Sequence, residues 1–271
     1  MNTKNKIVAI LMAGMVAMAV GVPMAMSAET PATSATVNNK APTVVSVSSD
    51  PETYVVMNVC PNTTPVNITA EVKDLNGVDN IDTVEVNILG IQDTYVAMTC
   101  SNTDDTTKSC YKVFNLDCCQ APGTYTATVK VTDKGSQSDT GTDDFTVNGT
   151  KALSINFDKV TFVGDPGSSD NAGNANITSG TSANVTSKGN AVIDIGVEAS
   201  DLSSTTTGDS IAGTNMKATI GAVGPAVVSP KNVFNTDTTC KEDESAAFTL
   251  SIPEAILPAN DYQGTLTISA E

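Results

Sequence analysis

The stretch Pro122–Asp133 constrains the fold most, because its residue types alternate without interruption after a Pro-Gly turn. One face would collect the apolar side chains of Tyr125, Ala127, Val129 and Val131, and the other face would collect threonines and a lysine. A period of two predicts a β-strand with one face in a hydrophobic core and the other in water.

The same alternation recurs along the chain and predicts its domain organisation. Short alternating segments occur at residues 66–72, 84–88, 191–197, 246–252 and 262–270, and turn residues separate them. No segment shows a sustained helical period. Strands at this spacing predict an all-β protein with two antiparallel β-sandwich domains in tandem. We expect these domains at residues 41–148 and 151–271.

The first 40 residues predict export. Lys4 and Lys6 precede an uncharged apolar run over residues 7–26, and Ala25 and Ser27 are small residues suited to signal-peptidase cleavage. Residues 1–27 are therefore interpreted as a signal peptide, and residues 28–40 as a flexible arm. Retention of the run as a membrane anchor is the alternative, because its length is about that of a spanning helix.

Composition excludes several classes of function. The chain has no His and no Trp, all 14 of its basic residues are Lys, and its formal net charge is −16. Nucleic-acid binding requires a basic surface and is excluded on this ground. Without His, neither a Ser-His-Asp triad nor a Cys-His pair can form. No catalytic residue is assigned, and we expect a protein that is not an enzyme.

Three motifs of the first predicted domain carry a resemblance. They are Ala41–Val45, Asp74–Gly77 and the run from Pro122 to Gly135. Together they resemble an Ig-like module, of the PKD type or the bacterial-Ig type, of archaeal or bacterial cell-surface proteins. The resemblance implies a sandwich that spaces, presents or adheres, and it points to an archaeal source. It carries over no catalytic or binding residue.

The second predicted domain has a different resemblance. Its strand, Asp165-Pro166-Gly167 loop, Gly189-Asn190 turn and Ile193–Val197 strand are similar to secreted filament-type β proteins. These are archaeal bundling-pilus and bacterial biofilm-fibre subunits, which join by donating a strand. For this chain, the resemblance implies that residues 28–40 or the first strand would complete a neighbour's sheet.

Six cysteines in an exported chain predict three disulfides. The Ig-type topology implied by the resemblance places Cys60 and the Cys118-Cys119 pair at one end of the sandwich. It places Cys100 and Cys110 around one loop at the other end. The expected bonds are Cys60–Cys118, Cys100–Cys110 and Cys119–Cys240. A redox or metal site is the alternative, which the absence of His and of a Cys-x-x-Cys motif disfavours.

Acidic and amide side chains suggest a calcium site. An Ig-type topology gathers three loops at one end of the first domain, and Ca²⁺ is the cofactor that such oxygen ligands suit. The candidate ligands are Asp74, Asn76, Asp79, Asp82, Asp104, Asp105, Asp133 and Asp139. Asp165 and Asp170 form a second candidate group. The competing interpretation is a solvated acidic rim with Asx turns, which the acidity of the whole chain favours.

Five sequons provide candidate glycosylation sites, although a chain so rich in Ser and Thr produces this motif by chance. They begin at Asn62, Asn67, Asn148, Asn176 and Asn184.

These features predict an exported, non-catalytic cell-surface protein with a structural or adhesive role. Its loop ends would be presented to other cell-surface proteins or to copies of itself. The alternative is a self-assembling extracellular filament subunit joined by strand donation, and a secreted enzyme is the third hypothesis. Contact with a membrane is expected only if residues 1–27 are retained as an anchor.

Overall fold

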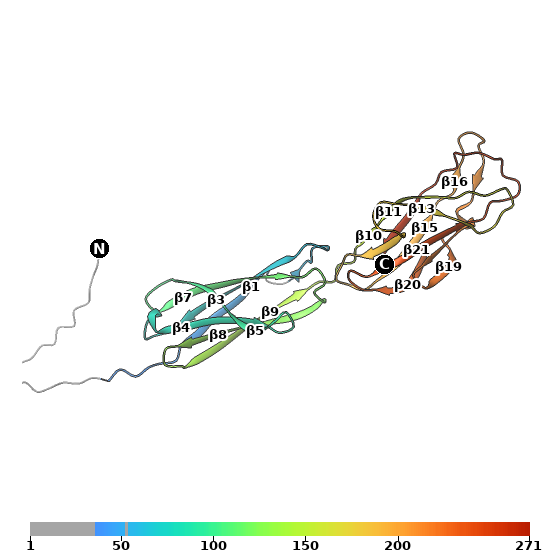
Figure 1. The fold of residues 1–271 in the computed structure, drawn as a ribbon. Helices are drawn as coiled ribbons and strands as arrows, with labels where there is room; N and C mark the ends of the chain where they lie inside the picture. Colours follow the sequence, from blue (N-terminus) through green and yellow to red (C-terminus); the bar gives the residue numbers. More distant parts are fainter. Residues whose placement is uncertain (1–35, 52–53) are drawn as a thin grey trace, which may run out of the picture. The chain divides into compact units, whose positions relative to one another are not determined.

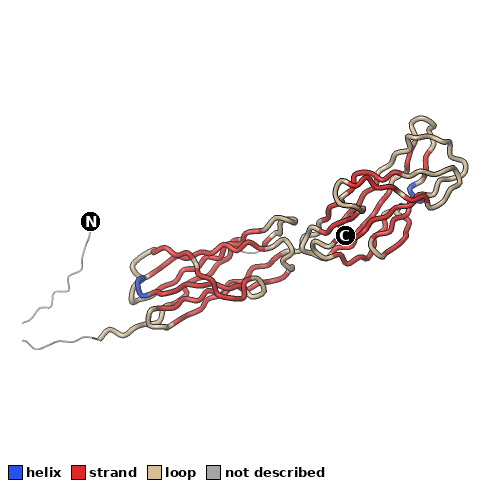
Figure 2. The backbone as a smooth tube through the Cα atoms, in the orientation of Figure 1, coloured by secondary structure: helices blue, strands red, loops and turns tan. Residues whose placement is uncertain are grey.

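The structure, a computed structural model, describes residues 36–51 and 54–271 (Figure 1). In these ranges the chain consists of strands and loops, with single 3-10 turns η1 (Val78–Asn80) and η2 (Gly213–Asn215) and no α-helix (Figure 2). The expected all-β fold is confirmed. Of the described residues, none belongs to a helix that could cross a membrane. The predicted signal peptide and most of the predicted arm lie outside the described residues.

The first half forms two facing sheets, which we call the N-terminal sandwich. Its strands are β1 (Thr43–Asp50), β2 (Tyr54–Val55), β3 (Thr64–Lys73), β4 (Ile81–Ile88), β5 (Gln92–Ala97), β6 (Thr99–Asn102), β7 (Thr107–Leu116), β8 (Gly123–Asp133) and β9 (Ser138–Val147). One sheet has the order β1-β3-β7-β6 and the other the order β2-β9-β8-β4-β5. Figure 1 shows β1, β3 and β7 in one layer and β4, β8 and β9 in the other.

Strand β8 lies inside its sheet, between β9 and β4, and the sequence predicted it as a strand with one face in the core. Ala127, Val129 and Val131 are completely buried, and they share one core with Val66 and Ile68 of the opposite sheet. Alternating burial along β8 is what a strand with one core face requires.

The second half forms several smaller antiparallel sheets, which we call the C-terminal sandwich. Its strands are β10 (Leu153–Ile155), β11 (Phe157–Thr161), β12 (Asn171–Ala172), β13 (Asn174–Ile177), β14 (Asn184–Ser187), β15 (Ile193–Ala199), β16 (Leu202–Ser203), β17 (Ser210–Ile211), β18 (Met216–Ile220), β19 (Val223–Val227), β20 (Asn232–Thr238), β21 (Asp243–Leu250) and β22 (Leu266–Ala270). The longest path is β10-β14-β21-β18-β19, with β12 paired to β21; β20-β15-β22, β11-β13 and β16-β17 are separate sheets.

The alternating segment at residues 262–270 does not form one strand. Only Leu266–Ala270 belongs to β22, because Gln263 exchanges backbone hydrogen bonds with Ser203 of β16 instead (2.9 and 3.1 Å). Competition from this second partner ends the pairing with β15 at Thr265, whose carbonyl oxygen accepts from Ser200 N (2.9 Å).

The two sandwiches have separate hydrophobic cores that differ in how well they are closed. The N-terminal core contains 19 buried apolar residues and 6 half-buried ones, whereas the C-terminal core contains 13 buried and 15 half-buried ones. Residues Asn39–Glu271 nevertheless form one compact unit, so the expected domain boundaries stay predictions. Half-buried apolar side chains are left partly in contact with water, and the C-terminal core is therefore open on one side.

All six cysteines form disulfides, in the three pairs that were expected. Cys60–Cys118 and Cys100–Cys110 lie within the N-terminal sandwich, and Cys119–Cys240 joins the β7–β8 loop to the β20–β21 turn. Cys100 and Cys110 close the loop as expected, because the two residues are directly opposite each other in the β6–β7 hairpin.

Candidate functional site

The open side of the C-terminal core is a groove between β11 and β22, with a volume of about 1030 Å³. Buried side chains form its floor, among them Phe157 of β11, Met216 of β18 and Leu250 of β21. Phe157 is held there by an edge-to-face contact with Phe248, whose ring centroid is 5.8 Å away. We call this cavity the apolar groove.

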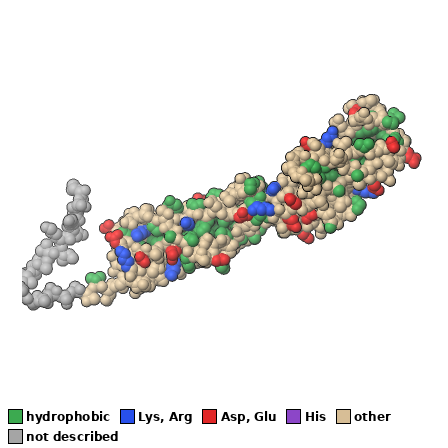
Figure 3. Space-filling view, viewed as in Figure 1, with side chains coloured by type: hydrophobic (Ala, Val, Ile, Leu, Met, Phe, Trp, Pro, Cys, Tyr) green, Lys and Arg blue, Asp and Glu red, His purple; other side chains and the backbone are tan. Residues whose placement is uncertain are grey.

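The rim of the apolar groove exposes large apolar side chains to water. Val163 is 85% exposed and Leu257 is 55% exposed, while Ile256, Leu266 and Ile268 are half-buried. Figure 3, in which hydrophobic side chains are green, shows that they reach the surface among polar ones on the face in view. A concave surface of this kind is typical of a binding site.

Strand β22 gives the groove a free backbone edge. It pairs with β15 on one side, and no strand of the described residues pairs with it on the other. Asp194 and Glu271 exchange both backbone hydrogen bonds (3.2 and 2.9 Å). Hydrogen-bonded positions alternate in an antiparallel ladder, so the N–H and C=O groups of Leu266, Ile268 and Ala270 point to the free edge.

The segment that follows β21 forms one wall of the groove, and Asp261 anchors it. The Asp261 carboxylate accepts hydrogen bonds from Ser204 Oγ (2.5 Å) and from the backbone and hydroxyl groups of Thr205 and Thr206 (2.8–3.0 Å). These donors, that of Ser204 first, hold the pKa of Asp261 well below its ordinary value. Tyr262 adds a bond from its hydroxyl to the Leu257 carbonyl oxygen (2.9 Å).

The three acidic loops predicted to bind Ca²⁺ do meet at one end of the N-terminal sandwich. Backbone bonds join Asp74 N to Thr106 O (2.8 Å) and Lys134 N to Asn80 O (2.9 Å). The buried carboxylate of Asp74 is used within its own loop, where it accepts from Asn76 N (2.7 Å) and Asn80 Nδ2 (2.9 Å).

The other predicted calcium ligands are similarly dispersed. Buried Asp133 accepts from Gln137 N (2.8 Å) and Asn39 Nδ2 (2.7 Å), and Asp139 accepts from Val44 N (2.9 Å). Asp79, Asp82, Asp104 and Asp105 are exposed. Throughout the described residues, three or more potential metal-ligating acidic or sulfur groups converge only at four cysteines. The calcium site, and the second group at Asp165 and Asp170, stay predictions.

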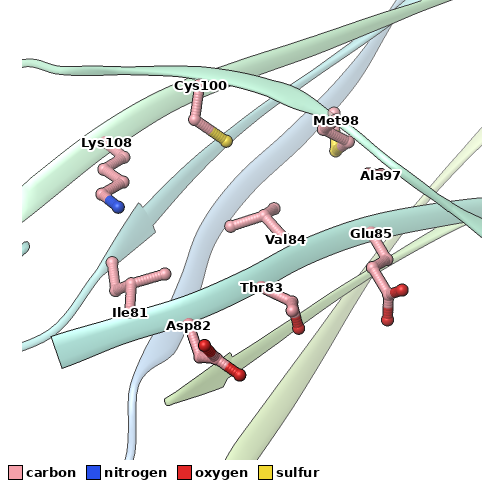
Figure 4. Close-up of a pocket in the computed structure, with 9 residues that line it drawn as sticks. All are labelled: Ile81, Asp82, Thr83, Val84, Glu85, Ala97, Met98, Cys100 and Lys108. Atoms are coloured by element: carbon pink, nitrogen blue, oxygen red, sulfur yellow. The ribbon is translucent and has the colours of Figure 1, made fainter. Parts of the chain in front are cut away.

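A smaller cavity of about 240 Å³ lies between β4 and the β5–β6 segment. Figure 4 shows its apolar side chains, Val84 and Met98 among them, with the acidic side chains of Asp82 and Glu85 on the other side of β4. Cys100, which also lines it, is bonded to Cys110 and offers no free thiol.

The candidate glycosylation sites differ in accessibility. Asn62 and Asn176 are exposed, whereas Asn67, Asn148 and Asn184 are half-buried. The Asn176 side chain already donates to Asp158 Oδ1 (2.7 Å) across the β11–β13 pair. Glycosylation stays a prediction at all five positions.

The apolar groove was not predicted from the sequence, because its residues are spread from Ile155 to Ile268. A weak signal was present: Val160, Phe162 and Val163 border a loop of Gly, Ser, Asn and Asp residues, and Ile256-Leu257 follows a proline outside any strand pattern. Such apolar residues have no place in a solvated loop.

No protein-family model matches the chain, and no curated protein matches it. Dimeric latent PorU from Porphyromonas gingivalis is 15% identical with a TM-score of 0.33, and covers 87% of this chain, which spans only 17% of PorU. The CsuC-CsuE chaperone–tip adhesion subunit pre-assembly complex of Acinetobacter baumannii Csu pili is 11% identical, with a TM-score of 0.36, over 81% of this chain and 97% of that one.

A third match comes from a structural study of promiscuous carbohydrate-binding modules of the β-sandwich superfamily. It is 15% identical with a TM-score of 0.28, and it covers 86% of this chain and 97% of the matched one. Likenesses at these TM-scores carry no information on function.

Proposed function

We propose that this protein is an exported, non-catalytic binding protein with an adhesive or structural role outside the cell. Its binding site is the apolar groove, and its ligand is an extended protein segment that adds a strand to the free edge of β22. The observation that carries the proposal is that an apolar groove with exposed apolar side chains on its rim lies beside the unpaired backbone edge of β22. Three disulfides are consistent with export.

Strand addition explains both features of the groove together. Backbone hydrogen bonds to the outward groups of Leu266, Ile268 and Ala270 would provide affinity, and alternate side chains of the guest would enter the groove. A strand of five residues spans about 17 Å, so it would insert two or three side chains. These side chains would cover apolar surface that is now in contact with water.

Binding of model peptides tests the proposal. The probes are fluorescent nine-residue peptides with alternating Val and Thr, and fluorescence anisotropy on the full chain is the measurement. We expect saturable binding, and loss of binding in Ala270→Pro. That change removes one outward N–H while leaving the β15–β22 bonds in place, and proline is tolerated on sheet edges.

A matched pair of variants provides the control. Leu257→Ser changes an apolar residue of the groove rim that is 55% exposed, and Val45→Ser changes one on β1 that is 53% exposed. Only Leu257→Ser should weaken peptide binding. No binding by any peptide, or equal binding in Ala270→Pro and wild type, would contradict the proposal.

The second candidate function is a filament subunit in which the donated strand comes from another copy of this chain. Val37, in the predicted arm, is favoured as the inserting residue because it is 84% exposed and belongs to no strand. Val37→Asp would then lack a donor and Ala270→Pro an acceptor. Each variant alone should stay monomeric, and their mixture should stop at dimers, as measured by light scattering.

The wild-type protein provides the decisive observation for this candidate. It should form ordered fibres, visible by negative-stain electron microscopy, as its concentration rises. A wild type that is monomeric at every concentration would exclude self-assembly and leave binding of a different partner in place.

A further inference from the structure

Four cysteine sulfurs from three segments meet between the two sandwiches. Cys60 follows β2, Cys118 and Cys119 lie in the β7–β8 loop, and Cys240 lies in the β20–β21 turn; their Sγ atoms all lie within 4.8 Å of one another. Sulfurs that belong to different disulfides are also close to one another. Cys60 Sγ is 3.5 Å from Cys240 Sγ and 3.9 Å from Cys119 Sγ. We call this group the four-sulfur cluster.

Hydrogen bonds that do not involve sulfur also hold these segments in place. Cys60 N donates to the Lys188 carbonyl oxygen (2.9 Å), and Cys119 N donates to Asp117 Oδ1 (2.9 Å). The same Asp117 carboxylate forms an ion pair with Lys241 at 3.2 Å, beside Cys240. The positions of the four residues therefore do not depend on the disulfides alone.

The distances between the sulfurs suit a tetrahedral metal ion. Structural Zn²⁺ sites often have four cysteine ligands with Zn–S bonds of about 2.3 Å, which places the sulfurs about 3.8 Å apart. The two separations across the disulfides, 3.5 and 3.9 Å, lie on either side of this value. The two bonded pairs would have to move apart, and the remaining separations, those from Cys118 Sγ to Cys119 Sγ and Cys240 Sγ, are at most 4.8 Å.

We propose that the four-sulfur cluster, once reduced, binds one Zn²⁺ ion through four thiolates. Two molecules of a low-molecular-weight dithiol supply the reduction: each transfers two electrons and two protons to one disulfide and becomes a cyclic disulfide. Binding of Zn²⁺ then releases the four thiol protons. The resulting site carries a charge of −2, beside the positively charged side chain of Lys241.

Metal binding by the reduced protein tests this inference. The full chain carrying Cys100→Ser and Cys110→Ser is reduced with a dithiol, freed of reductant under argon and titrated with Co²⁺, followed by Zn²⁺. We expect one Co²⁺ per chain with the intense thiolate charge-transfer and visible bands of a tetrahedral tetrathiolate site, and stoichiometric displacement by Zn²⁺. Native mass spectrometry gives an independent count of the bound metal.

Two controls separate the site from adventitious binding. Adding Cys240→Ser to the same protein removes one ligand and should weaken Zn²⁺ affinity at least about tenfold. The wild-type chain, in which Cys100 and Cys110 supply two further thiols, should still bind one ion. Absence of tetrahedral Co²⁺ bands from both proteins, or unchanged affinity in Cys240→Ser, would overturn the inference. Because the groove is elsewhere, peptide binding provides a separate test of the proposed function.

Discussion

The side-chain amide of Asn190 donates a hydrogen bond to the carbonyl oxygen of Gln120, 2.9 Å away, and so ties a turn of the C-terminal sandwich to the β7–β8 loop. Asn190 is buried, and its other groups are also used: Nδ2 donates to Asn148 O (3.0 Å) and Oδ1 accepts from Thr150 N (2.6 Å). One side chain thus satisfies three backbone groups where the two sandwiches meet.

Asn190→Ala should lower the free energy of unfolding by about 1–3 kcal/mol, because it leaves backbone groups unpaired around a buried position. Urea unfolding followed by circular dichroism measures the change. Asn102→Ala, at an exposed position of β6, is the control and should stay within about 0.5 kcal/mol of wild type. Equal stability of the two variants would show that Asn190 contributes no net stabilisation.

Tyr125→Phe should cost about 1 kcal/mol, the usual net value of a hydrogen bond. The Tyr125 hydroxyl donates to Ala121 O (2.7 Å) and accepts from Gln120 Nε2 (2.7 Å), which fixes the loop before β8. Thermal unfolding is the measurement. Tyr95→Phe is the matched change on an exposed ring, and it should leave the melting temperature unchanged; a comparable loss there would argue against the specific role of Tyr125.

Asp261→Asn should lower the melting temperature at neutral pH and have progressively less effect in acid. The depressed pKa of Asp261 means that its carboxylate stabilises the fold above its unfolded pKa of about 3.9, and that this stabilisation is lost as pH falls through the lower folded value. Thermal melts from pH 7 downwards should show the wild-type and variant curves converging below about pH 4.

The exposed change Asp79→Asn provides the comparison for Asp261. It should shift the melting temperature little at any pH. A difference between wild type and Asp261→Asn that stays constant down to strong acid would show that the ionised carboxylate is not the stabilising group.

Removing the Cys100–Cys110 disulfide by a double change to serine should destabilise the fold by about 3 kcal/mol on the loop-entropy account for a short closed loop. Comparison of urea unfolding of the double variant with that of oxidised wild type measures this. Reducing wild type affects all three bonds and therefore should cost more. A double variant as stable as wild type would show that the β6–β7 pairing alone closes this hairpin.

The fold could be predicted where one face of a strand alternates with the other. The apolar residues Ala127, Val129 and Val131 predict β8, because every second side chain of a strand with one core face is buried. The disulfide pairs also agree with the expectation, since the Ig-type resemblance placed Cys60 close to the Cys118-Cys119 pair. The start of β22 could not be predicted. The pairing of Gln263 with Ser203 depends on tertiary structure, and it does not change the alternation of apolar and polar residues over 262–270.

The candidate site could be predicted only in part. Acidic loops were correctly expected to gather, but whether a carboxylate binds an ion or its own turn depends on side-chain geometry, as Asp74 and Asn76 show. The apolar groove was not predicted, because whether a strand lies at the edge of its sheet is a property of the whole sheet. No local sequence pattern indicates that the edge of β22 at Ile268 has no neighbouring strand among the described residues.

The four-sulfur cluster gives the molecule a covalent connection that tolerates scrambling. Cys60, Cys118 and Cys119 all belong to the first half of the chain, and Cys240 is the sole member from the second. Whichever of those three Cys240 takes as its partner, the halves are cross-linked. Pairing with Cys118 or Cys119 leaves two sulfurs that can bond to each other, whereas pairing with Cys60 leaves the adjacent Cys118 and Cys119, which bond only with strain. Errors in oxidation at this spot would alter the pairing without ever separating the halves.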